Sequence, residues 1–211
     1  MIYYDFKLAP NPTKARIVIF EHKLDIDIHE IDVANKENLS EDFLSINPRG
    51  TVPALKLDDG CIIADSLAIG MYLDSCGTSD SLFGYDSYQK SKVIEKTTQC
   101  EDFYLGIQEQ FRNSLDRYKD RGLPGANPYK QIPELVDRGK LRVSNGLHLI
   151  EKSLNLSKYL AGDYYSFADI TMYVYMMFGT KVLKLQYEDY PNLMSWLKRI
   201  ESRDAVINAY A

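Results

Sequence analysis

Two short segments carry residue types that could bind an anion at the start of a helix. Asn11 followed by Pro12 predicts a helix start, with the asparagine as N-cap and the proline as the first helical residue. Asp65 and Ser66 precede the apolar positions of 67–73 and predict a second helix start. A helix N-terminus presents free N–H groups and a positive potential, so each segment is a candidate anion site. The alternative in each case is that the side chain only caps its helix.

The cysteines and histidines lack the spacing of a metal site or of a redox pair. The three cysteines are far apart, form no C-x-x-C pair and are expected to be buried apolar residues: Cys61, Cys76 and Cys100. The three histidines show no metal-ligand spacing: His22, His29 and His148. We therefore expect no bound metal and no disulfide framework.

The composition is that of an ordinary globular protein of 211 residues, with 45% hydrophobic and 26% charged residues. A formal net charge of −5 gives no positive footprint for nucleic acid and no attraction to an anionic membrane. The longest strongly apolar stretch, residues 170–179, is too short to span a bilayer. Asp5 and Lys7 interrupt the first apolar run, so we expect no signal peptide and a cytoplasmic location.

The first third of the chain predicts a small α/β unit. Its expected elements are a strand at 2–6, a helix from Pro12 to about His22, a strand at 26–31, a short helix at 41–46, a hairpin of 54–57 with 61–64, and a helix that opens at Asp65 and Ser66. Asn47-Pro48-Arg49-Gly50 predicts a turn before the hairpin. The first strand, helix and strand imply a parallel pair with a right-handed crossover, so the order is that of a thioredoxin-like fold.

The remainder of the chain predicts helices only. They are a long helix at 87–119, a helix around 147–154, an apolar helix at 170–178 and a final amphipathic helix that includes Leu193 and Trp196. Ser166 and Asp169 form a capping-box pattern before the apolar helix, which we expect at the buried centre. The predicted fold class is therefore α/β plus all-α, with a thioredoxin-like domain at 1–76, a linker at 77–86 and an all-helical domain at 87–211.

Five motifs together resemble the cytosolic glutathione transferases. In the first third they are Ala9-Pro10-Asn11-Pro12-Thr13-Lys14-Ala15-Arg16-Ile17, as in bacterial and fungal branches of the family, Asn47-Pro48-Arg49-Gly50-Thr51-Val52-Pro53-Ala54-Leu55, and Asp65-Ser66-Leu67-Ala68-Ile69 with Tyr72-Leu73. In the helical part they are Leu160-Ala161-Gly162-Asp163 through Asp169, and Tyr190-Pro191-Asn192-Leu193 with Trp196. The resemblance covers nearly the whole chain, in order and at the family's spacing. It implies a glutathione-binding domain followed by a helical domain, a homodimer, and glutathione as co-substrate.

The resemblance assigns the glutathione contacts to five residues. In the family the bond before Pro53 is cis, which lets the backbone of Val52 pair with the cysteinyl part of glutathione. Asp65 would bind the γ-glutamyl ammonium, and Ser66 at the helix N-terminus would bind the γ-glutamyl carboxylate. Lys36 lies in the loop where relatives contact the glycine carboxylate, and its alternative is a solvated loop charge.

The residue that activates the thiol departs from the family pattern. Relatives use a tyrosine, serine or cysteine near the first helix, because the thiolate is the nucleophile. The serine position falls on Ala9, which has no hydroxyl, and the cysteine position falls on Asn11. We take Asn11 as the candidate catalytic residue, since its amide could donate to the sulfur at a helix N-terminus. Three alternatives remain. They are Tyr4, which lies about one residue off the family register, backbone N–H groups, and an Asn11 that only caps its helix.

Tyr104, Phe111 and Tyr118 recur every seven residues on the predicted long helix. In the family this helix borders the site for the electrophile, so Tyr104 and Phe111 are candidates for that second-substrate site. The alternative is that the stripe belongs to the domain core or to a dimer contact.

The leading function is a glutathione S-transferase of the detoxification type, which conjugates the glutathione thiolate to a small hydrophobic electrophile. One alternative is a glutathione-dependent disulfide or peroxide reductase. Another is a non-catalytic binding or regulatory protein of the same fold, because Ala9 lacks the usual hydroxyl. The presence of Pro53, Asp65 and Ser66 argues against a mere scaffold.

Overall fold

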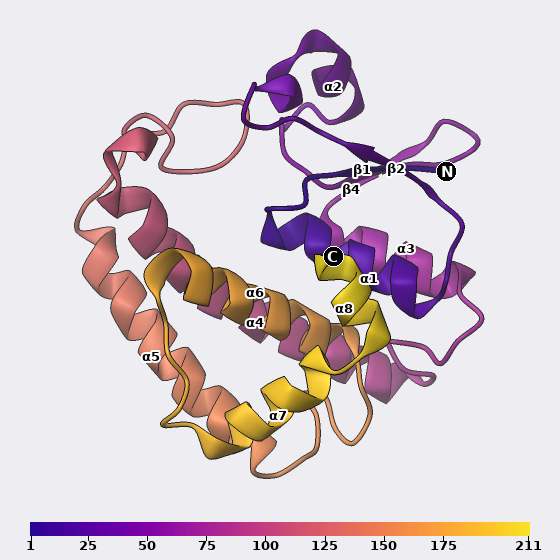
Figure 1. Ribbon diagram of the computed structural model, residues 1–211, viewed down its shortest axis with the longest axis vertical. Helices are drawn as coiled ribbons and strands as arrows, with labels where there is room; N and C mark the ends of the chain where they lie inside the picture. Colours follow the sequence, from indigo (N-terminus) through magenta and orange to yellow (C-terminus); the bar gives the residue numbers. More distant parts are fainter. The chain divides into compact units, whose positions relative to one another are not determined.

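The computed structural model describes residues 1–211, and its strands all lie in the first third of the chain (Figure 1). In chain order the elements are β1 Ile2–Asp5, α1 Pro10–Glu21, β2 Asp27–Glu30, the 3-10 turn η1 Glu37–Leu39, α2 Glu41–Ile46, β3 Ala54–Lys56, β4 Ile62–Ala64, α3 Ser66–Cys76, α4 Ser87–Ser114, the 3-10 turn η2 Asp116–Tyr118, α5 Leu135–Leu154, α6 Phe167–Leu183, α7 Pro191–Glu201 and α8 Asp204–Tyr210. The predicted fold class, α/β followed by all-α, is confirmed.

The chain divides into two compact units. Unit 1 comprises residues 1–79, 124–128 and 204–211, and unit 2 comprises residues 80–123 and 129–203. Unit 1 therefore includes two segments from the C-terminal half, 124–128 and α8, that no sequence pattern indicated. The domain ranges 1–76 and 87–211 stay a prediction.

Unit 1 is built on a four-stranded sheet in the order β2-β1-β3-β4. β1 pairs in parallel with β2, and β3 is antiparallel to both β1 and β4, as the expected crossover and hairpin require. Tyr3 faces α1, where its hydroxyl donates to the Pro12 carbonyl over 2.6 Å. Tyr4 lies on the other face and packs edge-on against Phe43 of α2. Helices α1 and α3 thus cover one face and α2 the other (Figure 1).

Helix α1 begins two residues earlier than predicted. Ala9 is the N-cap, with extended backbone, and Pro10 is the first helical residue, so Asn11 is the second helical residue rather than the N-cap. The prediction was wrong because Pro10, like Pro12, has a fixed φ that suits the first turn of a helix. Neither proline carries an N–H, so Asn11 alone among the first three helical residues has a backbone donor.

Arg16 connects the first turn of α1 to the end of β1 and to α8. It is 3% exposed and pairs with Asp5 at the end of β1. Its Nε donates to the Ala209 carbonyl of α8 over 2.9 Å, and its Nη2 donates to Thr13 Oγ1 over 3.0 Å. Burial raises the pKa of Asp5, and the Arg16 guanidinium opposes that rise. The N–H of Phe6 donates to the same carboxylate over 2.7 Å, so the chain after β1 is also held.

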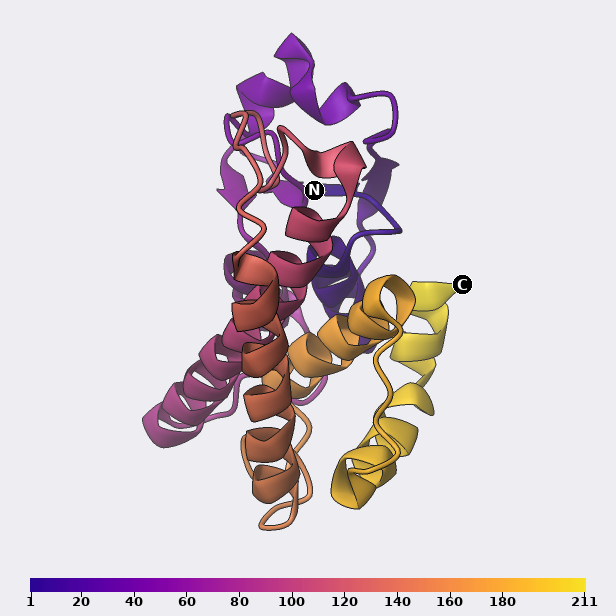
Figure 2. The same cartoon turned by 90° about the vertical axis from the view of Figure 1, so that its left-hand side faces the viewer.

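Unit 2 is a bundle of α4, α5, α6 and α7, in which α4 and α5 pack closely against each other (Figures 1 and 2). A Cβ on Gly139 would lie 2.7 Å from the Gly106 carbonyl oxygen, so only glycine permits this helix crossing. Beside the crossing, Glu109 accepts hydrogen bonds from Arg138 over 2.6 Å and Arg142 over 2.7 Å. Burial raises the pKa of Glu109, but the two arginines outweigh it and the pKa is lowered overall.

Helix α4 ends at Ser114 and not at the predicted residue 119. Leu115 has an extended backbone, with φ −111° and ψ 125°, and Tyr118 lies in η2. The Gln131 side chain donates to the Arg112 and Leu115 carbonyls, over 2.7 Å each. The carbonyls at this helix end are thus satisfied by a residue distant in sequence, which a periodic pattern does not reveal.

Helix α6 is the buried centre of unit 2, as its apolar sequence predicted, with eleven of its 17 residues buried. The capping box is confirmed: the N–H and Oγ of Ser166 donate to Asp169 over 3.0 and 2.8 Å. The Leu160 N–H and the Trp196 Nε1 donate to the same carboxylate over 3.0 and 2.8 Å. Burial raises the pKa of Asp169 to about 6, although these four donors favour the charged form.

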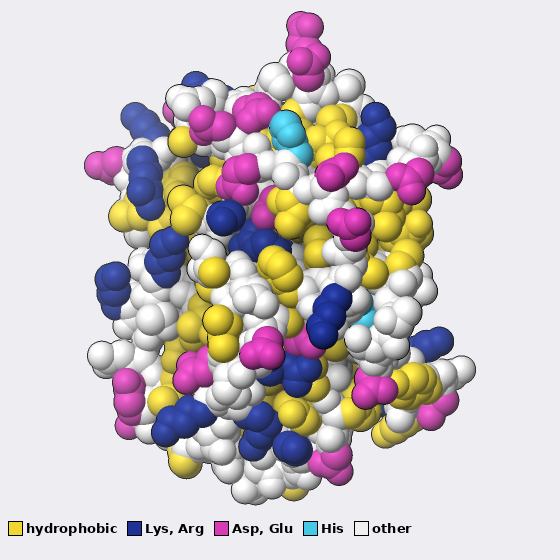
Figure 3. Space-filling view, turned by 45° about the vertical axis from the view of Figure 1, so that its right-hand side comes forward, with side chains coloured by type: hydrophobic (Ala, Val, Ile, Leu, Met, Phe, Trp, Pro, Cys, Tyr) yellow, Lys and Arg dark blue, Asp and Glu magenta, His cyan; other side chains and the backbone are white.

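The face drawn in Figure 3 carries charges of both signs. Figure 3 shows acidic and basic side chains interspersed on one face, which agrees with the formal net charge of −5. None of the helices combines the length and the apolar character that crossing a membrane requires.

Replacement of Arg16 by methionine is expected to lower the free energy of unfolding by about 3–5 kcal/mol, because the variant leaves the Asp5 carboxylate buried without its cation. Urea denaturation would measure the loss. The control is K92M, which removes the exposed pair of Lys92 with Glu95 and should cost less than about 1 kcal/mol. Equal losses in the two variants would contradict this account of Arg16.

Asp169 should make stability depend on pH in a defined direction. Its folded pKa of about 6 exceeds its unfolded value near 3.8, so the folded state binds the proton more tightly between these values. The contribution of Asp169 to stability therefore falls as the pH rises through this window, by about 2–3 kcal/mol. The unfolding free energy of the wild type minus that of D169N should decrease by this amount between about pH 4 and pH 7. A constant difference would show that the pKa is not raised.

Candidate functional site

The turn after α2 leads into a cis peptide bond between Val52 and Pro53. The Gly50 N–H donates to the Asn47 carbonyl over 2.9 Å and closes the predicted turn. Asn47, 3% exposed, holds the turn from inside, since its Nδ2 donates to the Thr51 carbonyl over 2.6 Å. The chain therefore reaches Val52 in a fixed direction.

The start of α3 gathers a carboxylate, a hydroxyl and N–H donors. Asp65 is the N-cap, and its Oδ1 accepts the Leu67 N–H over 2.9 Å. Its φ of +115° is strained for a residue other than glycine, and such strain concentrates at functional sites. Ser66 is 5% exposed, and its hydroxyl makes no hydrogen bond within the chain. This arrangement can receive a ligand that carries an ammonium group beside a carboxylate.

The sheet register brings these two segments to one edge of unit 1. Ala54 directly follows Pro53 and pairs with Ala64, which directly precedes Asp65. Ala54 also pairs with Tyr4, near the end of β1. The start of β3 and the ends of β1 and β4 therefore meet, and the cis bond and the start of α3 lie side by side.

Asn11 lies six residues beyond the end of β1, in the first turn of α1, and is half-buried. Its amide is thus carried by the segment that leaves the same edge of the sheet. Tyr4 instead belongs to a hydrophobic cluster with Ile31, Phe43 and Ala54, and is 9% exposed. The structure therefore assigns Tyr4 to the core of unit 1.

Lys36 is exposed, in the loop between β2 and α2, with a left-handed backbone at φ +65°. Two residues further on, the Asn38 Nδ2 donates to the Gly50 carbonyl over 2.7 Å. The loop of Lys36 is thereby attached to the turn that precedes the cis bond.

Tyr104 and Phe111 join an aromatic cluster within unit 2. Tyr104 stacks on Tyr175 with ring centroids 4.1 Å apart, and burial raises its pKa. Phe111 packs edge-on against Phe178 at 5.7 Å and against Tyr118 at 5.1 Å. Phe111 is 7% exposed, whereas Tyr104, Tyr118 and Phe178 are half-buried. The cluster combines core packing with a partly open aromatic surface.

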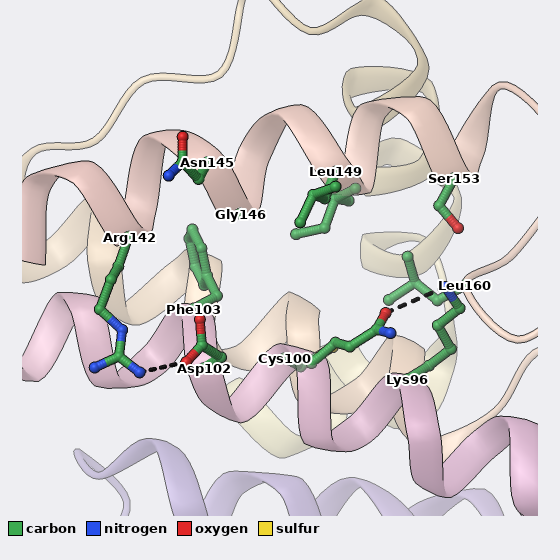
Figure 4. A pocket seen from close by; sticks show the side chains of 12 residues that line it. Lys96, Cys100, Asp102, Phe103, Arg142, Asn145, Gly146, Leu149, Ser153 and Leu160 are labelled. Atoms are coloured by element: carbon green, nitrogen blue, oxygen red, sulfur yellow. Dashed lines mark hydrogen bonds and ion pairs between the residues drawn. The ribbon is translucent and has the colours of Figure 1, made fainter.

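A separate pocket of about 290 Å³ lies between α4 and α5 in unit 2 (Figure 4). Cys100 and Phe103 line it from α4, and Leu149 and Ile150 line it from α5, so its wall is largely apolar. Neither Tyr104 nor Phe111 lines this pocket. No group of three or more His, Cys, Asp or Glu side chains in the chain is placed to hold a metal ion.

None of the three cysteines forms a disulfide, and they differ in exposure. Cys100 is buried as expected, but Cys61 and Cys76 are exposed, so the expectation was wrong for two of the three. Cys61 lies beside the turn of the β3–β4 hairpin and Cys76 ends α3, and at both places the local sequence does not reveal which side of the element is covered.

Sequence reasoning missed two contributors to the turn before the cis bond. Asn47 was predicted only as a turn residue. An asparagine at the start of a turn that also contains proline and glycine indicates side-chain hydrogen bonds to the backbone. No role in this turn was predicted for residues 124–128, yet the Ala126 N–H donates to the Arg49 carbonyl over 2.9 Å. No local sequence pattern predicts this second contact.

Comparisons with known proteins agree with this geometry. Residues 9–76 match the N-terminal domain of glutathione S-transferases, and residues 116–204 match their C-terminal domain. Glutathione S-transferase 1 of Manduca sexta is 31% identical, over 97% of this chain and 89% of that protein. Glutathione S-transferase 2 of Saccharomyces cerevisiae is 29% identical, over 98% of this chain and 88% of that protein.

A solved structure extends the agreement to three dimensions. The crystal structure of Gtt2 from Saccharomyces cerevisiae superposes with a TM-score of 0.86 at 29% identity, and the match covers 99% of this chain and 100% of that one. With both domain matches, a full-length relative above 30% identity and this superposition, the chain belongs to the glutathione S-transferase family.

Proposed function

We propose that the chain is a glutathione transferase that binds reduced glutathione at the edge of the unit 1 sheet and transfers its sulfur to a small hydrophobic electrophile. The observation that carries the proposal is the start of α3, where a strained Asp65 and a Ser66 with an unused hydroxyl lie beside the cis bond before Pro53. The names of the relatives favour neither a reductase nor a non-catalytic protein.

Glutathione would be held by complementary charges and by backbone pairing. Its γ-glutamyl carboxylate would accept from the Ser66 hydroxyl and from N–H groups at the start of α3. Its γ-glutamyl ammonium would pair with Asp65, whose Oδ2 is not used by the Leu67 N–H. The backbone of Val52 would pair with the cysteinyl part, and Lys36 would approach the glycine carboxylate.

Asn11 is the proposed activating residue. Conjugation requires the thiolate, so the thiol proton goes to solvent. The sulfur then forms a bond to the electrophilic carbon, and either a leaving group departs with its bonding electron pair or an activated double bond opens and its other carbon takes a proton from solvent. A side-chain amide donor at the start of α1 would stabilise the sulfur anion more than the thiol, and the helix dipole would add to this effect. Ala9 contributes no side-chain donor, which leaves this role to Asn11 and to backbone N–H groups.

For the second substrate we propose the aromatic surface that includes Tyr104 and Phe111. The half-buried rings of Tyr104, Tyr118 and Phe178 offer planar apolar area, and the buried Phe111 packs against two of them. Such a surface suits an aromatic or unsaturated electrophile. We further propose a cytoplasmic homodimer without a metal cofactor, as the family resemblance implies.

The glutathione site can be tested by titrating the wild type and S66A with reduced glutathione in a calorimeter. Loss of a hydrogen bond to a charged group should weaken binding by about tenfold or more. S75A is the matched control, because Ser75 lies on the same helix and donates only to the Tyr72 carbonyl. Absence of binding to the wild type would refute the proposed function. Binding together with disulfide reduction, but without conjugation of an aryl halide, would favour the reductase alternative.

Asn11 is tested by N11A through the pH dependence of the reaction. Without the amide donor, the pKa of bound glutathione should rise, and kcat below that pKa should fall by about 10- to 100-fold while the KM for glutathione changes little. The thiolate absorbance of the binary complex measures this pKa directly. N145A, which changes an exposed asparagine of α5, is the control. An unchanged thiol pKa in N11A would remove Asn11 from catalysis.

A further inference from the structure

The connection between α4 and α5 makes an unexpected contribution to unit 1. Residues 124–128, Pro-Gly-Ala-Asn-Pro, belong to unit 1, whereas the chain on both sides of them belongs to unit 2. We call this segment the strap. Figures 1 and 2 both show the α4–α5 connection running beside the chain between α2 and β3. The strap therefore lies against the turn that leads into the cis bond.

The strap meets the turn backbone to backbone. The Ala126 N–H donates to the Arg49 carbonyl over 2.9 Å. Gly125 has φ +114°, and a Cβ there would lie 2.8 Å from the same Arg49 oxygen. Opposite it, Gly50 has φ +62°, and a Cβ there would lie 3.2 Å from the Ala126 nitrogen. A glycine on each side thus allows an approach that side chains would prevent.

With the strap in place, the four polar backbone groups of Arg49 and Gly50 all have hydrogen-bond partners. The Arg49 N–H donates to Asn47 Oδ1 over 3.2 Å, and its carbonyl accepts from the strap. The Gly50 N–H closes the turn, and its carbonyl accepts from Asn38 over 2.7 Å. Without the strap, the Arg49 carbonyl would be the one group of these four that lacks a partner. The Arg49–Gly50 peptide, two residues before Val52, would then be held only by the hydrogen bond of the Gly50 N–H to Asn47.

The base of the strap is closed by hydrogen bonds that do not involve the turn. Within unit 2 the Gly122 N–H donates to the Tyr129 carbonyl over 2.8 Å, and the Tyr129 N–H donates to the Asp120 carbonyl over 3.1 Å. Residues 123–128 are thereby closed into a short loop with Pro124 and Pro128 near its ends. Such a loop loses little conformational entropy when its tip docks.

We infer that the strap is a positioning element for glutathione, which fixes the Arg49–Gly50 peptide so that the Val52 backbone is oriented for the cysteinyl group. This inference rests on the proposed function. The strap does not touch the reacting atoms, and it acts through the turn. It should therefore change the affinity for glutathione and leave the affinity for the electrophile unaltered.

The test compares G125A, A126P and A126G with the wild type. G125A places a methyl group against the Arg49 carbonyl, and A126P removes the N–H donor, so both should raise the Kd and KM for glutathione by about three- to tenfold. The KM for a model aryl halide should stay the same. A126G keeps the N–H donor and should bind glutathione within about twofold of the wild type.

The control for strain alone is G60A. Gly60 also has a positive φ, +86°, but a Cβ there would meet nothing within 4 Å. G60A should lose thermal stability through backbone strain alone and should keep its glutathione affinity. If G125A and A126P fold and bind glutathione as the wild type does, the strap has no positioning role. Failure of the wild type itself to bind glutathione would overturn the proposed function and this inference together.

Discussion

The buried guanidinium of Arg16 organises the part of the molecule in which the candidate site lies. It pairs with Asp5 at the end of β1, donates to Thr13 in the first turn of α1 and reaches the Ala209 carbonyl of α8. A buried charge is tolerated only when it is paired and hydrogen-bonded, so these segments must keep their mutual positions. The position of Asn11 at the start of α1 is a consequence of this constraint.

Around that anchor, the candidate site uses the edge of a small sheet. Parallel and antiparallel pairing bring the end of β1, the start of β3 and the end of β4 together. Each of these strand ends adjoins a polar segment. The end of β1 is followed by the start of α1, the start of β3 is preceded by the turn and the cis bond, and the end of β4 is followed by the start of α3. The site is therefore assembled from backbone groups and helix ends, and it needs few side chains. The proposed glutathione contacts are therefore compatible with Ala9, because none of them requires a side-chain hydroxyl at that position.

Unit 2 has a comparable internal anchor of its own. Asp169 caps α6, accepts from Leu160 and from Trp196 of α7, and lies entirely in the interior. The apolar α6 packs against α4, and the glycine crossing allows α5 to lie close to α4. The aromatic cluster that includes Tyr104 is thus held on a rigid framework, which the proposed second-substrate surface would require.

Local sequence patterns were sufficient for most of the architecture. The order of strands and helices, the turn at Asn47, the start of α3 at Ser66 and the capping box at Asp169 all depend on residues within a few positions of one another. The family resemblance likewise follows from short motifs. The candidate glutathione contacts could be named from these motifs because backbone geometry at turns and helix ends is a local property.

The features that the patterns missed all depend on contacts between distant residues. Helix α4 ends where Gln131 satisfies its carbonyls, α8 packs with unit 1, and the strap donates from Ala126 to Arg49. The sequence by itself determined which elements form and which family the chain joins, since hydrophobic period, caps and turn residues act over a few positions. Only the tertiary structure decided where α4 stops and which segments support the turn before Pro53, because those hydrogen bonds exist only once the chain has folded.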